Sequence, residues 1–180
     1  MKDKDLLQLF REEGKENYAF NLIVDKYSER LYWHIRKITA SHDDTNDILQ
    51  NTFVKAWNAL PSFREESRLY TWLYRIATNE SLTFIKKSKM RSFLSLSDYS
   101  KQVENQLEAD PYFNGDETQR IFRKAIMKLP GKQRAVFTMR YYDEMKYEEI
   151  SEILGTSVGA LKASYHHAFQ KIQEYLKESV

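Results

Sequence analysis

The chain has 180 residues, of which 42% are hydrophobic and 14% aromatic, which excludes a disordered protein and allows one large or two small domains. It contains no cysteine, which excludes disulfides and thiolate metal sites and is typical of a cytoplasmic protein. No stretch is apolar enough for a signal peptide or a membrane span, so membrane insertion is not expected.

The net charge of +2 is unevenly distributed along the chain. Residues 1–90 carry 15 basic and 13 acidic side chains, residues 91–117 carry 2 and 6, and residues 118–180 carry 11 and 7. Two mildly basic blocks are therefore joined by an acidic segment. Because phosphate contacts supply much of the affinity for DNA, this balance does not predict tight DNA binding by the chain alone.

The N-terminal block begins with two predicted amphipathic helices. A short helix is expected over residues 3–13, stopped by Gly14, and a longer one over residues 16–39. Trp33 and His34 fall near the edge of the apolar face of the longer helix. The residues that define this face recur every three or four positions: Phe20, Ile23, Val24, Tyr27, Leu31, Ile35 and Ile38.

Ser41 and the acids after it begin a helix over about residues 43–60, since carboxylates are favoured at a helix N-terminus. Four polar residues lie largely away from its apolar stripe and form an acidic, amide-rich outer surface: Asp44, Asp47, Gln50 and Asn51. Capping together with a solvated or partner-facing surface explains these acids better than a metal site does. No second cluster of ligands or histidine spacing supports a metal.

Pro61 ends this helix, and a short loop over residues 62–67 follows. Phe63 in the loop belongs to no helical stripe, so it either plugs the edge of the core or has a separate role. The next helix, over residues 68–91, carries Tyr70 and Tyr74 away from its core side.

The C-terminal end of that helix is basic, because no acid occurs from Ser81 to Ser97 while lysines and arginine gather there. Aromatic residues beside a basic run are typical of a single-strand platform, where bases stack on rings and cations follow phosphates. Cations at a favourable helix C-terminus are the alternative, which explains the lysines but not exposed tyrosines.

Residues 92–117 show no sustained periodicity and contain the turn signals Asp110-Pro111 and Asn114-Gly115. This acidic segment is predicted to be a linker with at most a transient helix at 101–109. Helices are then expected over residues 118–129 and 132–142, separated by Pro130-Gly131.

Residues 147–176 predict two helices separated by a tight turn at Gly155-Thr156-Ser157. Gly155 suits a left-handed turn, and Thr156 or Ser157 is a candidate N-cap for the second helix. The apolar stripe of the second helix consists of Leu161, Tyr165, Ala168 and Ile172. This is the pattern of a helix-turn-helix.

The outward face of the second helix bears Gly159, Ala163, His166 and Gln170, with Lys162 and His167 at its flanks. Small residues near its start would let it enter a major groove, where His166 and Gln170 could meet base edges and the flanking residues could reach phosphates. The alternative is an ordinary helical hairpin with a solvated polar face.

Two stretches of the chain resemble extracytoplasmic-function sigma factors of bacterial RNA polymerase. Residues 43–79 are similar to their core promoter-binding region, since Asp44, Asp47, Gln50 and Phe53 form the pattern that precedes the sequence WLYRIATN. Residues 128–169 are similar to their C-terminal helix-turn-helix domain. The two stretches stand in the expected order with a linker between them.

The resemblance implies an all-α protein with two helical domains joined by a flexible linker. Residues 1–91 would form a domain like sigma region two, residues 92–117 the acidic linker, and residues 118–180 a domain like sigma region four. It implies a dissociable specificity subunit that directs promoter-specific transcription initiation in the cytoplasm, with no enzymatic activity and no cofactor.

The resemblance also assigns roles to particular residues. Core polymerase would be bound through the clamp helices of its largest subunit, by Asp44, Asp47, Gln50 and Asn51, with the polymerase flap as a further contact. The minus-ten element would be captured as unstacked bases by Phe63, Arg64, Tyr70, Arg75, Asn79, Lys86 and Lys87. The minus-thirty-five duplex would be read by Thr156, Ser157, Lys162, Ala163, His166, His167 and Gln170. An anti-sigma factor is expected as the regulatory partner.

The chain departs from the family pattern at the second helix. Many members carry arginine at the position of His167, and often a basic or aromatic residue at that of His166. Two neutral imidazoles weaken the attraction for phosphate at pH 7, which indicates a different upstream sequence preference.

Two other functions fit part of the sequence. A helix-turn-helix repressor or activator would bind duplex DNA without polymerase, but it would not need the exposed polar face around Asp47. A recombinase or nuclease would place Asp43, Asp44 and Asp47 on a metal, yet metal-assisted phosphoryl transfer needs carboxylates that converge from different elements. In the free chain, the two domains are expected to pack against each other or against an inhibitor and so hide their DNA-binding faces.

Overall fold

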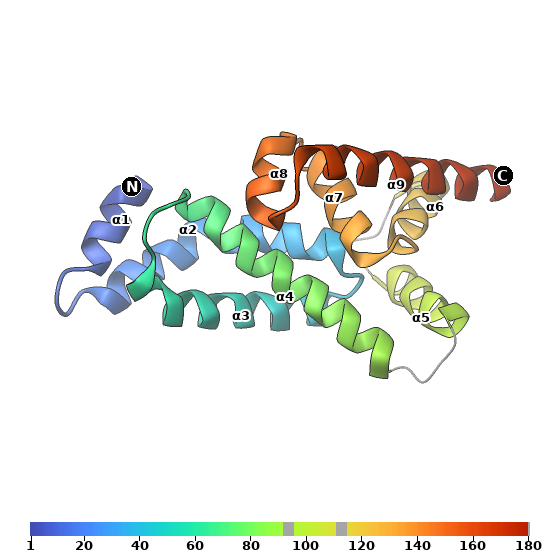
Figure 1. The fold of residues 1–180 in the computed structure, drawn as a ribbon. Helices are drawn as coiled ribbons and strands as arrows, with labels where there is room; N and C mark the ends of the chain where they lie inside the picture. Colours follow the sequence, from blue (N-terminus) through green and yellow to red (C-terminus); the bar gives the residue numbers. More distant parts are fainter. Residues whose placement is uncertain (92–95, 111–114, 180) are drawn as a thin grey trace.

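The structure is a computed structural model, and it describes residues 1–91, 96–110 and 115–179. Within these ranges the chain forms helices and no strand, so the all-α prediction is confirmed (Figure 1). The helices of the described ranges fall into an N-terminal group, a connecting helix and a C-terminal group.

The N-terminal group is a bundle whose short first helix packs along the second. It comprises α1 (Asp3–Phe10), α2 (Glu16–Ile38), α3 (His42–Ala59), a short 3-10 turn (Leu60–Ser62) and α4 (Leu69–Arg91). The predicted stripe of α2 is mostly confirmed, since Ile23, Tyr27, Leu31, Ile35 and Ile38 are buried. Edge-to-face rings of Phe20, Phe53 and Trp57 close the end of the bundle where α2 meets α3.

The C-terminal group comprises α6 (Glu117–Met127), α7 (Gly131–Tyr141), α8 (Tyr147–Leu154) and α9 (Val158–Glu178). Its core joins Ala125, Ile126, Leu129 and Phe137 to Ala168 and Ile172 of α9. Phe137 stacks on Tyr165 with ring centroids 5.4 Å apart, which anchors the long α9 across α7.

The connecting segment differs from the predicted linker. A helix, α5 (Leu96–Glu108), begins earlier than the transient helix expected at 101–109. Val103 and Leu107 are buried against Ala40 of the N-terminal group and Met127 of the C-terminal group. Arg36 of α2 also forms an ion pair with Asp110, and Lys124 of α6 with Glu108 at 2.7 Å. Contacts from both neighbours therefore hold the described part of this segment, and its own weak periodicity could not show them.

The two groups meet along an interdomain seam, which has α2 and α4 on one side and α7 and α8 on the other. One hydrophobic cluster crosses the seam, and the C-terminal group contributes Ala135, Val136, Met139, Met145, Ile150, Ile153 and Leu161 to it. The expectation that the domains of the free chain pack against each other agrees with this arrangement.

Arg134 of α7 crosses the seam as a buried cation that is 2% exposed. Nη1 donates to the carbonyl of Ile38 in α2 at 2.9 Å, and Nη2 donates to the carbonyls of Met127 and Leu129. These carbonyls belong to the last turns of α2 and α6 and to the α6–α7 connection, where no helical N–H follows to satisfy them. Arg134 therefore joins the two groups through main-chain acceptors.

We expect Arg134→Met to lower the free energy of unfolding by about 2–4 kcal/mol, because buried carbonyls would lose charged donors. Arg120→Met is the matched control, and a change at this exposed position should stay within about 0.5 kcal/mol. Urea unfolding followed by circular dichroism measures both variants. Equal midpoints would contradict the structural role of Arg134.

None of the helices in the described part of the chain has an apolar stretch of the length that a bilayer crossing requires.

Candidate functional site

The helix-turn-helix has the geometry that its sequence predicts. Gly155 ends α8 in the left-handed conformation with φ of 63°. The Ser157 hydroxyl accepts the main-chain N–H of Ala160 at 3.3 Å and caps α9, so Ser157 is the N-cap and Thr156 is not. Leu161, Ala168 and Ile172 are buried, which turns the opposite face of α9 away from the protein.

That outward face is a continuous exposed surface. Its exposed members are Ser157, Lys162, Ala163, His166, His167 and Gln170, while Thr156 is half-buried in the turn. The imidazoles of His166 and His167 lie 6.2 Å apart, and Lys162 Nζ lies 5.8 Å from the ring of Tyr147 in α8. The face thus offers one cation, two imidazoles and an amide beside small residues, which suits contacts with both base edges and phosphates.

A hollow of about 340 Å³ lies beside the loop before α4. It is lined by Ser62, Phe63, Arg64, Ser67, Trp72 and Arg75, among others. Phe63 is half-buried and its ring lies on Trp72, with centroids 4.8 Å apart and planes at 35°. Both interpretations of Phe63 are therefore still supported. Its ring packs on Trp72, and its side chain also lines a hollow that two arginines share.

The expectation of a run of exposed tyrosines on α4 is wrong. Tyr74 is only 4% exposed, and Tyr70 is half-buried, with its ring 4.2 Å from that of Tyr74. Arg30 of α2 covers the Tyr70 ring at 4.9 Å, and burial raises the pKa of both phenols. The two rings belong to the packing between α2 and α4, whereas Asn79, Lys86 and Lys87 remain exposed on α4.

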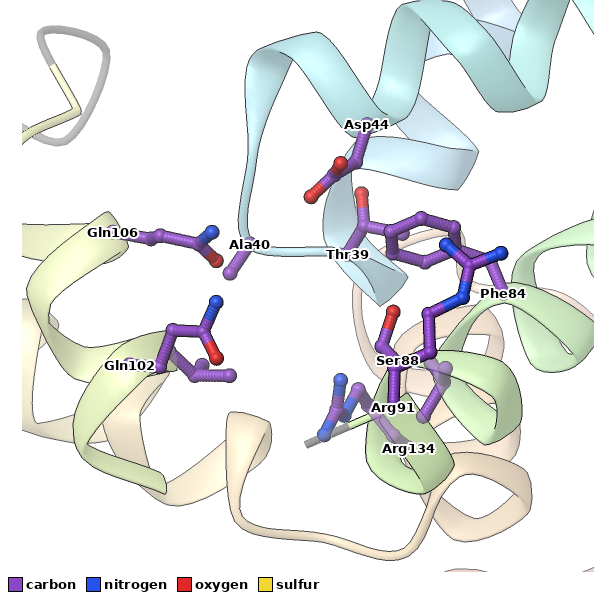
Figure 2. A pocket seen from close by; sticks show the side chains of 11 residues that line it. Thr39, Ala40, Asp44, Phe84, Ser88, Arg91, Gln102, Gln106 and Arg134 are labelled. Carbon is purple, nitrogen blue, oxygen red and sulfur yellow. The ribbon is translucent and has the colours of Figure 1, made fainter. Parts of the chain in front are cut away.

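The acidic face of α3 is divided between solvent and a cavity. Asp47, Gln50 and Asn51 are exposed, whereas Asp44 is half-buried. Figure 2 shows the Asp44 carboxylate pointing into a cavity of about 430 Å³, above Thr39 and opposite Gln106 of α5. Burial raises the pKa of Asp44, and the neighbouring carboxylates of Asp47 and Asp43 add to the rise.

A buried histidine is the largest departure from the sequence expectations. His34, expected at the edge of the α2 stripe, is 1% exposed. Its Nε2 lies 2.8 Å from Thr78 Oγ1, its ring lies 4.6 Å from that of Tyr74, and Nδ1 lies 3.4 Å from Asp143 Oδ2 across the seam. The helical period could not reveal this position, because its polar partners are 44 and 109 residues away in sequence.

Among the residues that the structure describes, no three His, Cys, Asp or Glu side chains are arranged to hold a metal ion. Asp43, Asp44 and Asp47 all lie on α3, and within the described ranges no acid from another element joins them in such a group. A metal-dependent nuclease would need carboxylates that converge from different elements.

Comparison with known proteins connects these surfaces. The family model for sigma-70 region 2 matches residues 23–91, and that for sigma-70 region 4 matches residues 119–172. The ECF RNA polymerase sigma factor SigW of Bacillus subtilis (strain 168) is 31% identical over 168 residues, which cover 89% of this chain and 90% of SigW. The chain belongs to the extracytoplasmic-function sigma factors.

Other sigma factors agree with this assignment. The ECF RNA polymerase sigma-E factor of Escherichia coli (strain K12) is 30% identical over 183 residues, covering 93% of this chain and 92% of that protein. The sigma factor RpoE of Bartonella quintana, solved with the anti-sigma factor NepR, matches with a TM-score of 0.62 and 25% identity over 88% of this chain and 96% of that one. CnrH, solved with the cytosolic domain of CnrY, shares the fold with a TM-score of 0.67 and 21% identity over 99% of both chains.

The matched regions coincide with the surfaces described above. Region 2 covers most of α2 and all of α3 and α4, which carry the exposed face around Asp47 and the hollow at Phe63. Region 4 covers most of α6 through most of α9 and therefore includes the helix-turn-helix. The prediction of a sigma factor made from the sequence is confirmed, whereas the roles of individual residues remain predictions.

Proposed function

We propose that three separate surfaces of this sigma factor carry out its function, which is to bind core RNA polymerase and direct transcription initiation at particular promoters. The observation that carries the proposal is the exposed polar face of Asp47, Gln50 and Asn51. Thr45, Ile48 and Thr52 bury the opposite side of α3, so the fold does not need these exposed polar residues. A repressor or activator acting without polymerase would not need them either.

The first surface would bind core polymerase at the clamp helices of its largest subunit. One carboxylate and two amides would supply hydrogen-bond acceptors and donors from a single rigid helix. Asp44, which was assigned to the same surface, faces the cavity beside α5. We therefore propose Asp47, Gln50 and Asn51 as the direct contacts, with Asp44 contributing only if α5 moves.

The second surface would capture the minus-ten element as a single strand. A base that leaves the duplex loses stacking worth a few kcal/mol, and stacking on an aromatic ring returns about 1–3 kcal/mol. The hollow at Phe63 offers a ring, hydroxyls and the guanidinium groups of Arg64 and Arg75. Asn79, Lys86 and Lys87 continue this polar and basic path along α4.

The third surface is the outward face of α9, which would read the minus-thirty-five element as duplex DNA. His166 and Gln170 are placed to reach base edges, and Lys162 and His167 are placed to reach phosphates. The polymerase flap would contact the same C-terminal domain. A sigma factor is not an enzyme, so the proposed chemistry is binding alone, and its place of action would be the cytoplasm.

Run-off transcription with core polymerase and a promoter library tests the function. We expect a defined subset of promoters to be transcribed only when the chain is added. A chain that bound duplex DNA specifically but neither bound core polymerase nor supported transcription would instead be a repressor or activator.

We also infer that an anti-sigma factor restrains this chain, because the sigma factor RpoE described above was solved in complex with the anti-sigma factor NepR. Copurification of the chain from its native host with a stoichiometric protein that blocks transcription would support this inference. Full transcriptional activity of all the native chain, with no protein bound to it, would contradict the inference.

Two substitutions on α9 should separate base contacts from phosphate contacts. We expect His166→Ala to cost about 1–3 kcal/mol of binding and to relax preference at one base pair. Lys162→Ala should instead weaken all sequences alike and lower the salt slope by about one. Binding titrations of the holoenzyme on single-base variants of the minus-thirty-five element, at several salt concentrations, measure both effects. A uniform loss for His166→Ala would make it a phosphate or structural contact.

A further inference from the structure

One side chain of the proposed minus-ten surface is already bound within the chain. Arg75 of α4 donates from Nε at 3.2 Å and from Nη2 at 2.6 Å to the main-chain carbonyl of Glu152 in α8. Glu152 lies in the last turn of α8, where carbonyls lack helical partners and the helix dipole favours a cation. The end of α8 therefore competes with DNA for the Arg75 guanidinium.

A second polar contact holds the same two groups of helices together. Asp143, in the connection between α7 and α8, lies between His34 and Lys37 of α2, and Lys37 Nζ contacts its Oδ1. The Asp143 side chain is 14% exposed. Burial alone would raise the pKa of this carboxyl, but hydrogen bonds and charges from His34 and Lys37 outweigh it and lower the pKa.

The positions around His34 show why this contact is specific. Thr78 Oγ1 donates to the carbonyl of Tyr74 at 2.7 Å, so its lone pairs accept from His34 Nε2. Because α2 and α4 hold the imidazole in this way, Nδ1 faces the seam, where the imidazolium form donates to Asp143 Oδ2, while Lys37 Nζ donates to Oδ1 of the same carboxylate. We define Asp143 with His34 and Lys37 as the Asp143 latch.

The apolar part of the seam adds to these polar contacts. Met139, Met145, Ile150 and Ile153 are each at most 5% exposed, and they share one hydrophobic cluster with α2 and α4. Burying four large side chains strongly favours the packed arrangement in water. Domains joined by a large hydrophobic interface are not expected to move freely relative to each other.

The other DNA-binding surface is not involved in the seam. Lys162, His166 and Gln170 are exposed, and Figure 1 shows α9 along the top of the C-terminal group, with α7 between it and α4. The expectation that the packed state hides both DNA-binding faces is therefore wrong for α9. The seam therefore engages a side chain of the minus-ten surface but leaves the minus-thirty-five surface exposed.

We propose that the free sigma factor rests in a closed state, held by the Asp143 latch and by α8 on Arg75, that withholds the Arg75 guanidinium of its minus-ten surface while leaving its minus-thirty-five surface available. The proposal rests on the proposed function for the identity of those two surfaces, but the latch itself does not. Full capture of the single strand, with Arg75 on a phosphate or base, then requires the seam to open. A ligand that binds only the open state has its apparent affinity reduced by the fraction of chain that is open.

The latch is tested first without DNA. The chain has no cysteine, so N58C and Q173C place one dye on α3 and one on α9 at exposed positions. We expect single-molecule energy transfer to show the full-length chain closed, and D143K to raise the open-to-closed ratio by about tenfold or more, because the new lysine faces Lys37 and His34. E144K, a matched charge reversal at the exposed neighbour, should leave the ratio unchanged. D143N keeps nearly the same side-chain shape, so it shows whether the effect of D143K comes from misfolding. We expect D143N to raise the open-to-closed ratio as well.

The unequal masking is tested with two probes from a promoter recovered by run-off transcription. One probe is its non-template minus-ten segment as a labelled single strand, and the other is its minus-thirty-five element as a duplex. We expect D143K and D143N to bind the single strand about tenfold more tightly than the unmodified chain, and the duplex with unchanged affinity, because only the first probe needs the open state. E144K should match the unmodified chain on both probes.

Each contrary result identifies what has failed. Equal energy transfer in D143K, D143N and E144K would overturn the latch, whether or not the chain supports transcription. Opening in D143K with no gain for the single strand, or an equal gain for both probes, would overturn the unequal masking. Opening in D143K with no transcription from any promoter would refute the proposed function, and the masking with it, while the latch would stand.

Discussion

Replacing Asp47 with arginine and Gln50 with alanine is expected to reduce binding to core polymerase at least a hundredfold while leaving the fold unchanged. Asp47 and Gln50 are exposed one turn apart on α3, so the double substitution would reverse the charge at the proposed contact and remove the amide beside it. Removing a charged contact at the centre of an interface costs about 2–5 kcal/mol. The melting temperature should stay within about 2 °C, since exposed substitutions shift stability within about 0.5 kcal/mol.

The matched control makes the same change of charge elsewhere on the N-terminal domain. Asp25→Arg with Gln8→Ala alters two exposed residues on α2 and α1 and should bind core polymerase like the unmodified chain. Surface-immobilised core polymerase measures the affinity of both double variants. If both double variants bind core polymerase as tightly as the unmodified chain does, the assignment of the α3 face is wrong. If both lose affinity equally, net charge alone governs binding.

Phe63→Ala and Asn79→Ala are expected to impair opening of a duplex promoter more than tenfold, yet to affect a template already melted across the minus-ten region much less. A base pocket contributes only after the base has left the stack, so the pocket helps to offset the cost of melting. Losing one stacked base of about 1–3 kcal/mol corresponds to this size of effect. Permanganate footprinting of the open complex, with run-off transcription from both templates, provides the measurement.

The packing of Phe63 on Trp72 requires a stability control for this experiment. Each variant should therefore be compared on both templates within one preparation, so that a loss of folded protein cancels in the ratio. Tyr18→Ala removes an aromatic ring that is 61% exposed on α2 and should leave the ratio unchanged. If the Phe63 and Asn79 variants lose activity equally on both templates, the hollow positions the strand and does not drive melting.

The interdomain seam connects these two experiments. Arg75 lines the hollow at Phe63 and is also held by the end of α8, whereas the α3 face is remote from that contact. Core polymerase could therefore bind the α3 face while the seam is still closed. Opening would then be the step that frees Arg75 for the minus-ten strand.

The sequence alone determined the positions of most helices and the local geometry of the helix-turn-helix. Apolar residues at a helical period placed α2, α3, α4 and the later helices close to their observed bounds, because burying one face of a helix is a local requirement. Gly155 and the Ser157 cap were also predictable, since a left-handed turn and an unsatisfied N-terminus each favour particular residue types. The outward face of α9 followed from its buried stripe.

Tertiary structure alone decided how polar residues far apart in the sequence are paired. His34, Arg134 and Asp143 looked like ordinary polar residues, and no helical period indicates a partner 96 or 109 residues away. Tyr74 was expected at the surface but is buried, because its side chain is covered by elements other than its own helix. The period of a helix reports which face is apolar, whereas the packing of separate helices determines what each polar side chain meets.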